Sequence, residues 1–170
     1  MKRFLLLLSL LLFNNIFSQT NKIIISNHRN SPVYFYIGSN TRNNLGLDCI
    51  DLAVSTKVTI LQPQSEVSYK TINDALSSYP SINDWKAIEF NNEYFVDLSL
   101  SQQVSSQITD YTEWDHIKFY IEDPTINPNA EMYYLGPWCS PNPLAAQYYI
   151  SVTGMSAEWT DTGEVNVIIN

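Results

Sequence analysis

Few of the residues that enzymes most often use are present in this chain. Its 170 residues include two histidines, two cysteines, and only 9 lysines and arginines against 17 aspartates and glutamates. A nucleophile–base pair would have to use His28 or His116. A closed zinc site needs four Cys or His ligands, and those available are scattered along the chain. The shortage of positive charge also argues against nucleic acid and anionic lipid as partners.

Two sequence features of other exported or membrane proteins are missing as well. No Asn-x-Ser/Thr acceptor occurs, so shielding by N-linked glycans is not expected. No apolar run reaches the about 20 residues that a membrane-spanning helix needs. No internal repeat and no Pro/Ser/Gly linker divides the chain, which indicates one domain.

The first eighteen residues have the pattern of a secretory signal peptide. Two basic residues precede the apolar run Phe4–Phe13, and a small residue, Ser18, stands before Gln19. We expect residues 1–18 to be removed and residues 19–170 to form a single secreted or periplasmic domain, with no membrane insertion afterwards. Without the two basic residues of the signal, the net charge of −8 becomes −10.

The negative charge is concentrated in the second half of the sequence. From Ala87 to Asn170 there are twelve acidic residues, and Lys118 is the only lysine or arginine. Such a distribution is typical of a solvated acidic surface that keeps a secreted protein soluble. It also fits a site for a cation or a basic partner.

The two cysteines predict a disulfide bond, because exported proteins usually mature in an oxidising compartment. A bond between Cys49 and Cys139 would close a long loop. On the chain-entropy model it would stabilise the fold by somewhat more than about 4 kcal/mol before any strain. The alternative is two buried thiols that behave as small apolar side chains.

Period-two alternation dominates the mature chain. In Val33–Ile37 the odd positions are the core candidates, and in Asp115–Ile121 the residues Ile117, Phe119 and Ile121 share one face. Similar short stretches are bounded by Asn, Asp, Pro, Ser or Gly, as strands are: 22–26, 57–61, 67–71, 85–90, 94–100, 132–135, 147–153, 157–160 and 164–169. The inserts 39–48, 123–129 and 136–143 are expected to be loops.

The fold predicted from this pattern is all-β. We expect an antiparallel β-sandwich of immunoglobulin-like or jelly-roll-like layout, with about ten strands. One short helix is expected after Asn73 as its cap, ending before Pro80. The clearest hairpin turns through Asp161-Thr162-Gly163, with the glycine at the position of positive φ.

Two catalytic patterns fail on inspection. Asp161-Thr162-Gly163 matches the tripeptide of aspartic proteases, but that chemistry needs two such carboxylates and the chain has one copy. His116 follows Asp115 directly, and neighbours in a regular strand point to opposite faces. Asp115 is therefore not expected to orient His116.

Oxygen-rich segments favour a hard cation more than other metals. Asp110, Glu113 and Asp115 lie close together in sequence, and a second group contains Asp123, Asn127, Asn129 and Glu131. Calcium takes carboxylate and amide oxygens from such loops, although no EF-hand spacing is present. The first group is the candidate calcium site, and no other cofactor is expected.

The eleven tyrosines and four tryptophans are the remaining clue to function. Alternation places Tyr34 and Tyr36 on one side of their strand, and Trp114, His116 and Tyr120 on one side of another. An aromatic face of this kind offers rigid amphipathic area for a sugar ring or a protein surface. The alternative is that loops cover these side chains and that they belong to the core.

These observations predict a secreted, non-catalytic binding or structural module that contacts an extracellular carbohydrate or protein through its aromatic face. A small secreted hydrolase that uses Glu113, Asp115 and Glu131 is the alternative. The two differ in geometry, since an enzyme needs convergent groups in a concave pocket. A binding module needs only an exposed aromatic patch.

Overall fold

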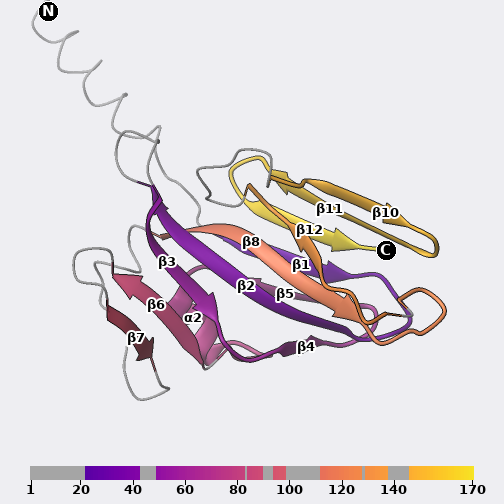
Figure 1. Ribbon diagram of the computed structural model, residues 1–170, viewed down its shortest axis with the longest axis horizontal. Coiled ribbons are helices and arrows are strands. Elements are labelled where there is room, and N and C mark those ends of the chain that lie inside the picture. The colour runs from indigo at the N-terminus through magenta and orange to yellow at the C-terminus, as the bar shows by residue number, and fades with distance from the viewer. Residues whose placement is uncertain are drawn as a thin grey trace, which may run out of the picture.

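The computed structural model describes residues 22–42, 49–82, 84–89, 94–98, 112–127, 129–137 and 146–170. Most of these residues lie in strands of two sheets, and one short helix is found among them (Figure 1). The predicted β-rich class is confirmed. The signal peptide, Asp110, Cys139 and the thiol of Cys49 lie outside the described parts, so the disulfide stays a prediction.

The first sheet, sheet A, contains five strands in the order β10-β11-β12-β1-β5. Their bounds are Ile23–Asn27 (β1), Ser65–Tyr69 (β5), Tyr149–Val152 (β10), Met155–Asp161 (β11) and Val165–Ile169 (β12). β1 and β12 run parallel, with Ile25 beside Val167, while the other pairs are antiparallel. The sheet is therefore mixed, which corrects the purely antiparallel prediction.

The second sheet, sheet B, follows the order β7-β6-β3-β2-β8-β9, with β4 also paired to β2. Their bounds are Val33–Arg42 (β2), Cys49–Ser55 (β3), Thr59–Leu61 (β4), Trp85–Glu89 (β6), Tyr94–Leu98 (β7), Thr112–Ile121 (β8) and Tyr133–Leu135 (β9). β2 and β8 run side by side along most of their length (Figure 1).

Two features of sheet B differ from the prediction. β3 was absent from the predicted strands, although Ile50, Leu52 and Val54 alternate with their neighbours as a strand requires. β2 also continues through Ser39–Arg42, the first part of a segment expected to be a loop. The described part of the chain therefore contains twelve strands, against the predicted ten or so.

Both sheets contribute to one hydrophobic core. Ile25 and Val167 of sheet A belong to the same cluster as Phe35 and Phe119 of sheet B, and all four are fully buried. The predicted inward faces of β2 and of the C-terminal part of β8 are confirmed. Burying apolar side chains on one face of each strand is the main stabilising term in such a fold.

The helix α2 (Ile72–Ser77) lies between β5 and β6. Its N-cap is Thr71, whose hydroxyl accepts a hydrogen bond from the backbone N–H of Asp74 at 3.1 Å. The prediction of Asn73 as the cap is wrong, because Ile72 and Ala75 must both face the core and this starts the helix earlier. No helix in the described residues has the length and hydropathy to span a membrane.

The hairpin between β11 and β12 is confirmed. Asp161 pairs with Val165, and Gly163 has a φ of 102° in the turn. The backbone N–H of Gly163 donates to Oδ1 of Asp161 at 3.3 Å. The Asp161-Thr162-Gly163 tripeptide therefore acts as a turn in this fold.

Candidate functional site

A β-bulge in β8 decides which of the predicted site residues reach the surface. Gly38 of β2 pairs with His116, but the next residue, Ser39, pairs with Trp114. Asp115 is therefore the extra residue, and a bulge of this kind re-aims the side chains next to it. In β8, the strict alternation of side chains between the two faces of the sheet, assumed from the sequence, holds only from His116 onward.

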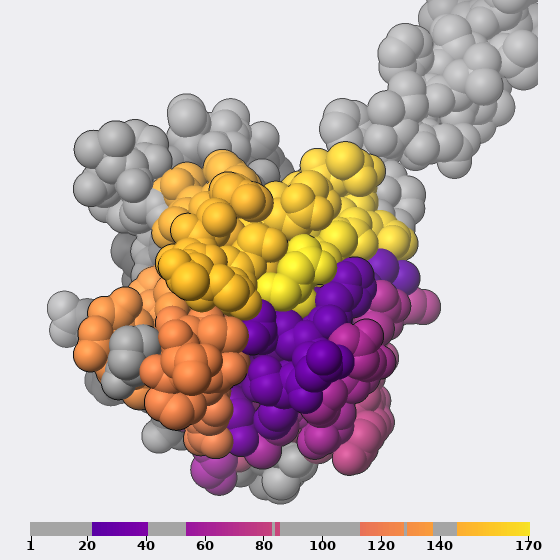
Figure 2. Space-filling view, turned by 90° about the vertical axis from the view of Figure 1, so that its right-hand side faces the viewer, coloured from indigo at the N-terminus to yellow at the C-terminus, as the bar shows by residue number. Residues whose placement is uncertain are grey.

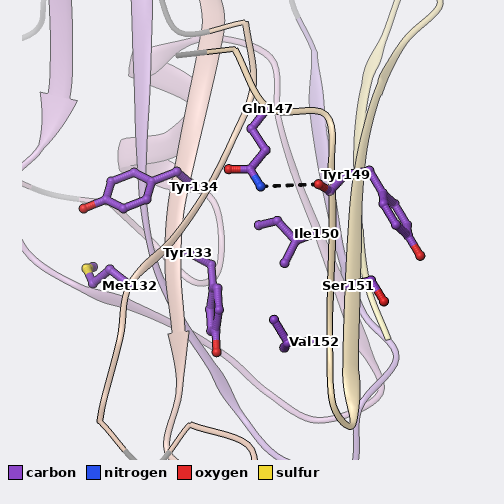
Figure 3. A pocket seen from close by; sticks show the side chains of 8 residues that line it. All are labelled: Met132, Tyr133, Tyr134, Gln147, Tyr149, Ile150, Ser151 and Val152. Carbon is purple, nitrogen blue, oxygen red and sulfur yellow. Dashed lines mark hydrogen bonds between the residues drawn. The ribbon is translucent and has the colours of Figure 1, made fainter. Parts of the chain in front are cut away.

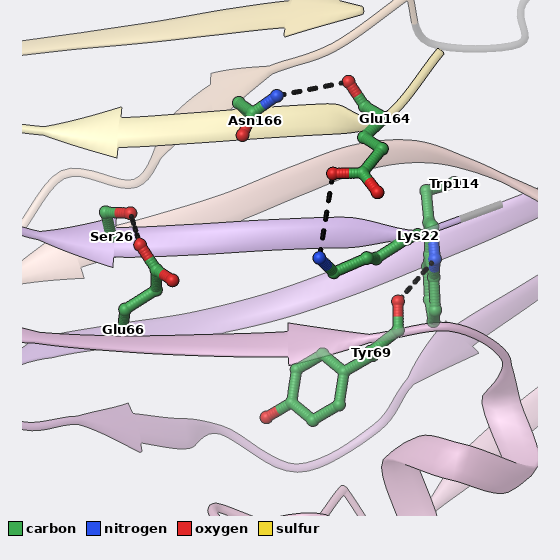
Figure 4. A network of polar contacts seen from close by, with 7 residues as sticks. All are labelled: Lys22, Ser26, Glu66, Tyr69, Trp114, Glu164 and Asn166. Atoms are coloured by element: carbon green, nitrogen blue, oxygen red, sulfur yellow. Dashed lines mark hydrogen bonds and ion pairs between the residues drawn. The ribbon is translucent and has the colours of Figure 1, made fainter. Parts of the chain in front are cut away.

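The bulge turns Trp114 into the core. Its side chain is 5% exposed, its ring lies 6.2 Å from that of Trp85, and its Nε1–H donates to the carbonyl of Tyr69 at 3.2 Å (Figure 4). The prediction that Trp114 shares an outward face with Tyr120 is therefore wrong. One extra residue shifts the side-chain alternation from one face of the sheet to the other.

The same bulge brings Asp115 and His116 together. Oδ2 of Asp115 lies 3.0 Å from Nδ1 of His116, and Nδ2 of Asn40 donates to Oδ1 of Asp115 at 2.7 Å. All three residues are at most 2% exposed. The prediction that Asp115 cannot orient His116 is wrong, because it assumed a regular strand. Neither residue belongs to an exposed aromatic face.

Two glycines make room for this buried polar cluster. A Cβ atom on Gly38 would overlap the imidazole ring of His116. A Cβ atom on Gly136, whose φ is 125°, would overlap the backbone of Asp115. Because both positions require the absence of a side chain, the bulge is a specified part of the fold.

The carboxylates proposed for a hydrolase do not gather in one place, while the candidate calcium site stays a prediction because Asp110 lies outside the described residues. Asp115 is held by Asn40 and His116, and Glu113 lies two residues earlier in β8, opposite Asn40. Glu131 donates its backbone N–H to Asn127, whose own side chain bonds the carbonyl at the far end of β8, Ile121. Ile121 lies six positions after Asp115 in the strand, which is about 20 Å. Among the described residues no three His, Cys, Asp or Glu side chains form a metal-binding group.

The second oxygen-rich segment uses its polar groups to hold its own loop. The carboxylate of Asp123 accepts hydrogen bonds from the hydroxyl and the backbone N–H of Thr125, and these bonds lower the pKa of Asp123. Nδ2 of Asn127 donates to the carbonyl of Glu131 at 2.9 Å. These contacts account for the residue types in the loop.

The outer side of sheet B carries two cross-strand rows, which we call the tyrosine face. One row runs across β4, β2 and β8, and the other across β2, β8 and β9. Residues opposite one another in neighbouring strands point to the same side of a sheet. The tyrosine face consists of Ile60, Tyr34 and Tyr120 in the first row and Tyr36, Lys118 and Tyr134 in the second.

Close ring contacts give the tyrosine face a defined geometry. The rings of Tyr34 and Tyr120 stack with their centroids 4.9 Å apart and their planes at 10°. Nζ of Lys118 lies 5.6 Å from the centre of the Tyr134 ring, within cation–π range. Ile60 and Tyr134 are each 43% exposed. Tyr34, Tyr36 and Tyr120 are half-buried, so the predicted clustering of these three tyrosines stands.

Glu122 adds a charged edge to the tyrosine face. The hydroxyl of Tyr34 donates to Oε2 of Glu122 at 3.0 Å. This hydrogen bond to a carboxylate raises the pKa of Tyr34, and partial desolvation raises the pKa of Tyr120. Both side chains are therefore neutral hydrogen-bonding groups at ordinary pH.

Sequence reasoning missed Ile60 and Tyr134 as members of this face. Both lie in stretches predicted as strands, 57–61 and 132–135, which the structure contains as β4 and β9, but which strands these pair with was not predicted. Their place follows only from the pairing register with β2 and β8, which no local pattern encodes. Lys118 was predicted on the same side as Tyr120, and this is confirmed.

The outer side of sheet A is different in character. Ser26 donates to Glu66 at 2.8 Å, and Lys22 forms an ion pair with Glu164 at 3.6 Å (Figure 4). On the four strands β11, β12, β1 and β5 the outward side chains include no aromatic residue. Besides these polar pairs, the half-buried side chains of Ile24 and Ile168 lie on this side of the four strands.

Comparisons with known proteins give no assignment. No protein-family model, curated protein or solved structure matches this chain. The functional argument therefore depends on the geometry of the two faces alone.

Proposed function

We propose that this protein is a secreted β-sandwich module that binds another protein through its tyrosine face. The observation that carries the proposal is the stacked pair of Tyr34 and Tyr120, flanked by exposed Ile60. It forms a rigid, partly apolar ridge on a sheet whose inner side is already occupied by the core. Aromatic side chains that are held in place lose little conformational entropy on binding.

The contrast between the two outer faces supports this choice of surface. On β11, β12, β1 and β5, sheet A presents mainly polar side chains beside half-buried Ile24 and Ile168, whereas sheet B presents tyrosines, a lysine and an isoleucine in register. Apolar area rimmed by polar groups is the composition expected of an interaction surface. The shared core of the two sheets supports the sandwich arrangement, and the signal peptide pattern supports export.

Ring orientation favours a protein over a carbohydrate. A sugar ring stacks on the free face of an aromatic side chain. At 4.9 Å and 10°, each of the two rings covers one face of the other, and Ile60 lies beside Tyr34 on its second side, which leaves less ring face open to a sugar. Edges and neutral hydroxyls suit hydrogen bonding to a polypeptide, for which tyrosine is the commonest paratope residue.

The test compares retention of proteins from the extracellular fraction of the producing cells. The immobilised protein and its Tyr79→Ser control should retain a partner that the double variant Tyr34→Ser/Tyr120→Ser loses by at least about tenfold. Tyr79 is a matched control because it is 89% exposed and lies outside the tyrosine face. Equal retention by all three proteins would contradict the proposal. A glycan array on which binding depends on Tyr34 and Tyr120 would assign the face to carbohydrate instead.

A further inference from the structure

A groove separates the edge strands of the two sheets. β9 is the last strand of sheet B and β10 the last strand of sheet A. A single bridge joins them, with Gly136 and Gln147 exchanging two backbone hydrogen bonds of 2.7 and 3.1 Å. Beyond the bridge the strands separate and leave a groove of about 530 Å³ (Figure 3). Figure 2 shows the orange residues that follow β8 against the gold residues of β10 and β11.

The groove lies between two segments that are antiparallel but hydrogen-bonded only at the Gly136–Gln147 bridge. Its lining comes from Met132–Tyr134 on one wall and from Gln147 and Tyr149–Val152 on the other. If the register of the Gly136–Gln147 bridge continued, Tyr134 would stand opposite Tyr149 and Tyr133 opposite Ile150. Tyr133 and Ile150 point toward the gap, whereas the side chains of Tyr134 and Tyr149 point away from it on opposite sides (Figure 3).

The backbone of β10 turns hydrogen-bonding groups toward this groove. Tyr148 accepts a hydrogen bond from the N–H of Trp159 in β11 at 2.9 Å. Hydrogen-bonded and non-hydrogen-bonded pairs alternate in an antiparallel ladder, so the backbone of Ile150 also bonds to β11. The backbone N–H and C=O groups of Tyr149 and Ser151 point away from β11, toward the groove. Gln147 lies two residues before Tyr149, and its backbone groups bond to Gly136 on that same side. In the described parts of the chain no strand pairs with Tyr149 or Ser151 on that side.

A side chain takes the place of the missing strand at one position. Nε2 of Gln147 donates to the carbonyl of Tyr149 at 3.4 Å, a long hydrogen bond drawn in Figure 3. The contact places this carbonyl on the open side of β10. An amide on a flexible side chain is readily exchanged for a backbone N–H of better geometry.

The charge near the groove indicates what kind of peptide would bind there. Acidic residues adjoin both walls, since Glu131 precedes Met132 and Glu158 pairs with Tyr149, while Lys118 lies against the Tyr134 ring on the tyrosine face. The lining itself carries no charge, and its floor has the apolar side chains of Tyr133, Ile150 and Val152 (Figure 3). An extended peptide with apolar residues in its centre and basic residues at its ends complements both features.

A second copy of the chain fits the groove less well. Pairing two β10 strands edge to edge would bring the whole of the second sheet A against β9, which forms the opposite wall. A single extended strand has no such obstacle. β10 has four residues, so the paired segment is about 13 Å long.

We infer that the groove between β9 and β10 binds an extended, basic-flanked peptide segment of another protein, which adds as a strand to the edge at Tyr149 and Ser151. Backbone hydrogen bonds provide affinity in this mode of recognition, and alternate side chains entering the floor provide selectivity. Tyr134 belongs to both surfaces, but Tyr149 and Ser151, with which the peptide would pair, lie outside the tyrosine face, so this inference goes beyond the function proposed for that face.

The test selects binders from a phage-displayed library of random heptapeptides and measures them on the parent protein and on two variants. Ser151→Pro removes the N–H that points into the groove, and proline is tolerated on an edge strand at such a position. Ser151→Val keeps that N–H and is the matched control. The enriched peptides should be basic, should lose at least tenfold in affinity on Ser151→Pro, and should bind Ser151→Val as they bind the parent protein.

A second measurement on the unmodified protein keeps the inference testable if Ser151→Pro does not fold. Bound peptide should slow amide hydrogen exchange at Tyr149 and Ser151, while Ile150 is already protected by β11. The inference would be overturned if no enriched peptide depended on Ser151 for binding. It would also be overturned if bound peptide left the exchange rates of the Tyr149 and Ser151 amides unchanged. Tyr34→Ser/Tyr120→Ser should bind the peptides normally, so failure of one site is distinguishable from failure of the other.

Discussion

His116 occupies the space in which a side chain on Gly38 would lie. The two residues pair across β8 and β2, and a Cβ atom on residue 38 would overlap the imidazole ring. Since His116 is 2% exposed, its ring has little room to move away. We expect Gly38→Ala to lower the free energy of unfolding by about 1–3 kcal/mol, the usual cost of overpacking. Denaturation by urea, with the midpoint read at constant slope, measures this change.

The origin of that cost can be isolated with a second variant. In a His116→Ala background the ring is gone, so Gly38→Ala should cost much less than it does in the parent protein. Equal costs in the two backgrounds would show that the ring and residue 38 are not in contact. His116→Ala is itself expected to be destabilising, since it leaves the buried carboxylate of Asp115 with one contact fewer.

Trp114→Ala should destabilise the protein by about 3–5 kcal/mol, as truncation of a core tryptophan does. The reason is the burial of its ring beside Trp85 and the hydrogen bond to Tyr69. The exposed Tyr79 provides the comparison, because Tyr79→Ala should change stability by less than about 0.5 kcal/mol. Equal unfolding midpoints for the two variants would contradict the position of Trp114 in the core.

Tyr69 predicts a loss of stability at high pH. Its side chain is fully buried, its hydroxyl donates to the carbonyl of Pro80 at 2.6 Å, and burial raises its pKa far above the usual value of 10. The raised folded-state pKa favours the neutral form, so this stabilisation is complete below pH 10 and is lost as the pH rises above it. Stability measured between pH 8 and 11 should therefore fall above pH 10.

A tyrosine without its hydroxyl identifies the group responsible. Tyr69→Phe should be less stable at pH 7 by about 1 kcal/mol, because the Pro80 carbonyl loses its donor. Its unfolding free energy should also fall less steeply above pH 10. A slope identical to that of the parent protein would assign the pH dependence to other residues.

The mass of the exported protein tests two predictions made from the sequence alone. Intact-mass measurement should find a chain that begins at Gln19 and lacks the two hydrogens lost on forming the Cys49–Cys139 bond. Reduction should then lower the unfolding temperature. A chain that still begins at Met1, or a mass with two free thiols, would contradict the corresponding prediction.

Local patterns were sufficient wherever each strand was regular. Alternation placed Val33, Phe35 and Ile37 in the core, and Gly163 marked the turn between β11 and β12. These features depend on the period of a strand and on the backbone freedom of glycine, both of which can be read from a few neighbouring residues.

Features that depend on distant residues could not be read in this way. The bulge at Asp115 requires the small residues Gly38 and Gly136 on two other segments, and it reversed the face of Trp114. The parallel pairing of β1 with β12 joins opposite ends of the described chain. In both cases the deciding contact joins residues far apart in the sequence, so it cannot be predicted from the residues around either position.

The most direct test of the central claim is oxidative footprinting of tyrosine side chains in the fluid where the protein acts. If the tyrosine face binds a protein partner, then Tyr34, Tyr36 and Tyr120 should be labelled at least several-fold more slowly in the native extracellular fraction than in the purified protein. Tyr79, which is 89% exposed and not a member of that face, should be labelled equally in both. Equal labelling of all four tyrosines in the two conditions would contradict the claim that this face is the binding surface.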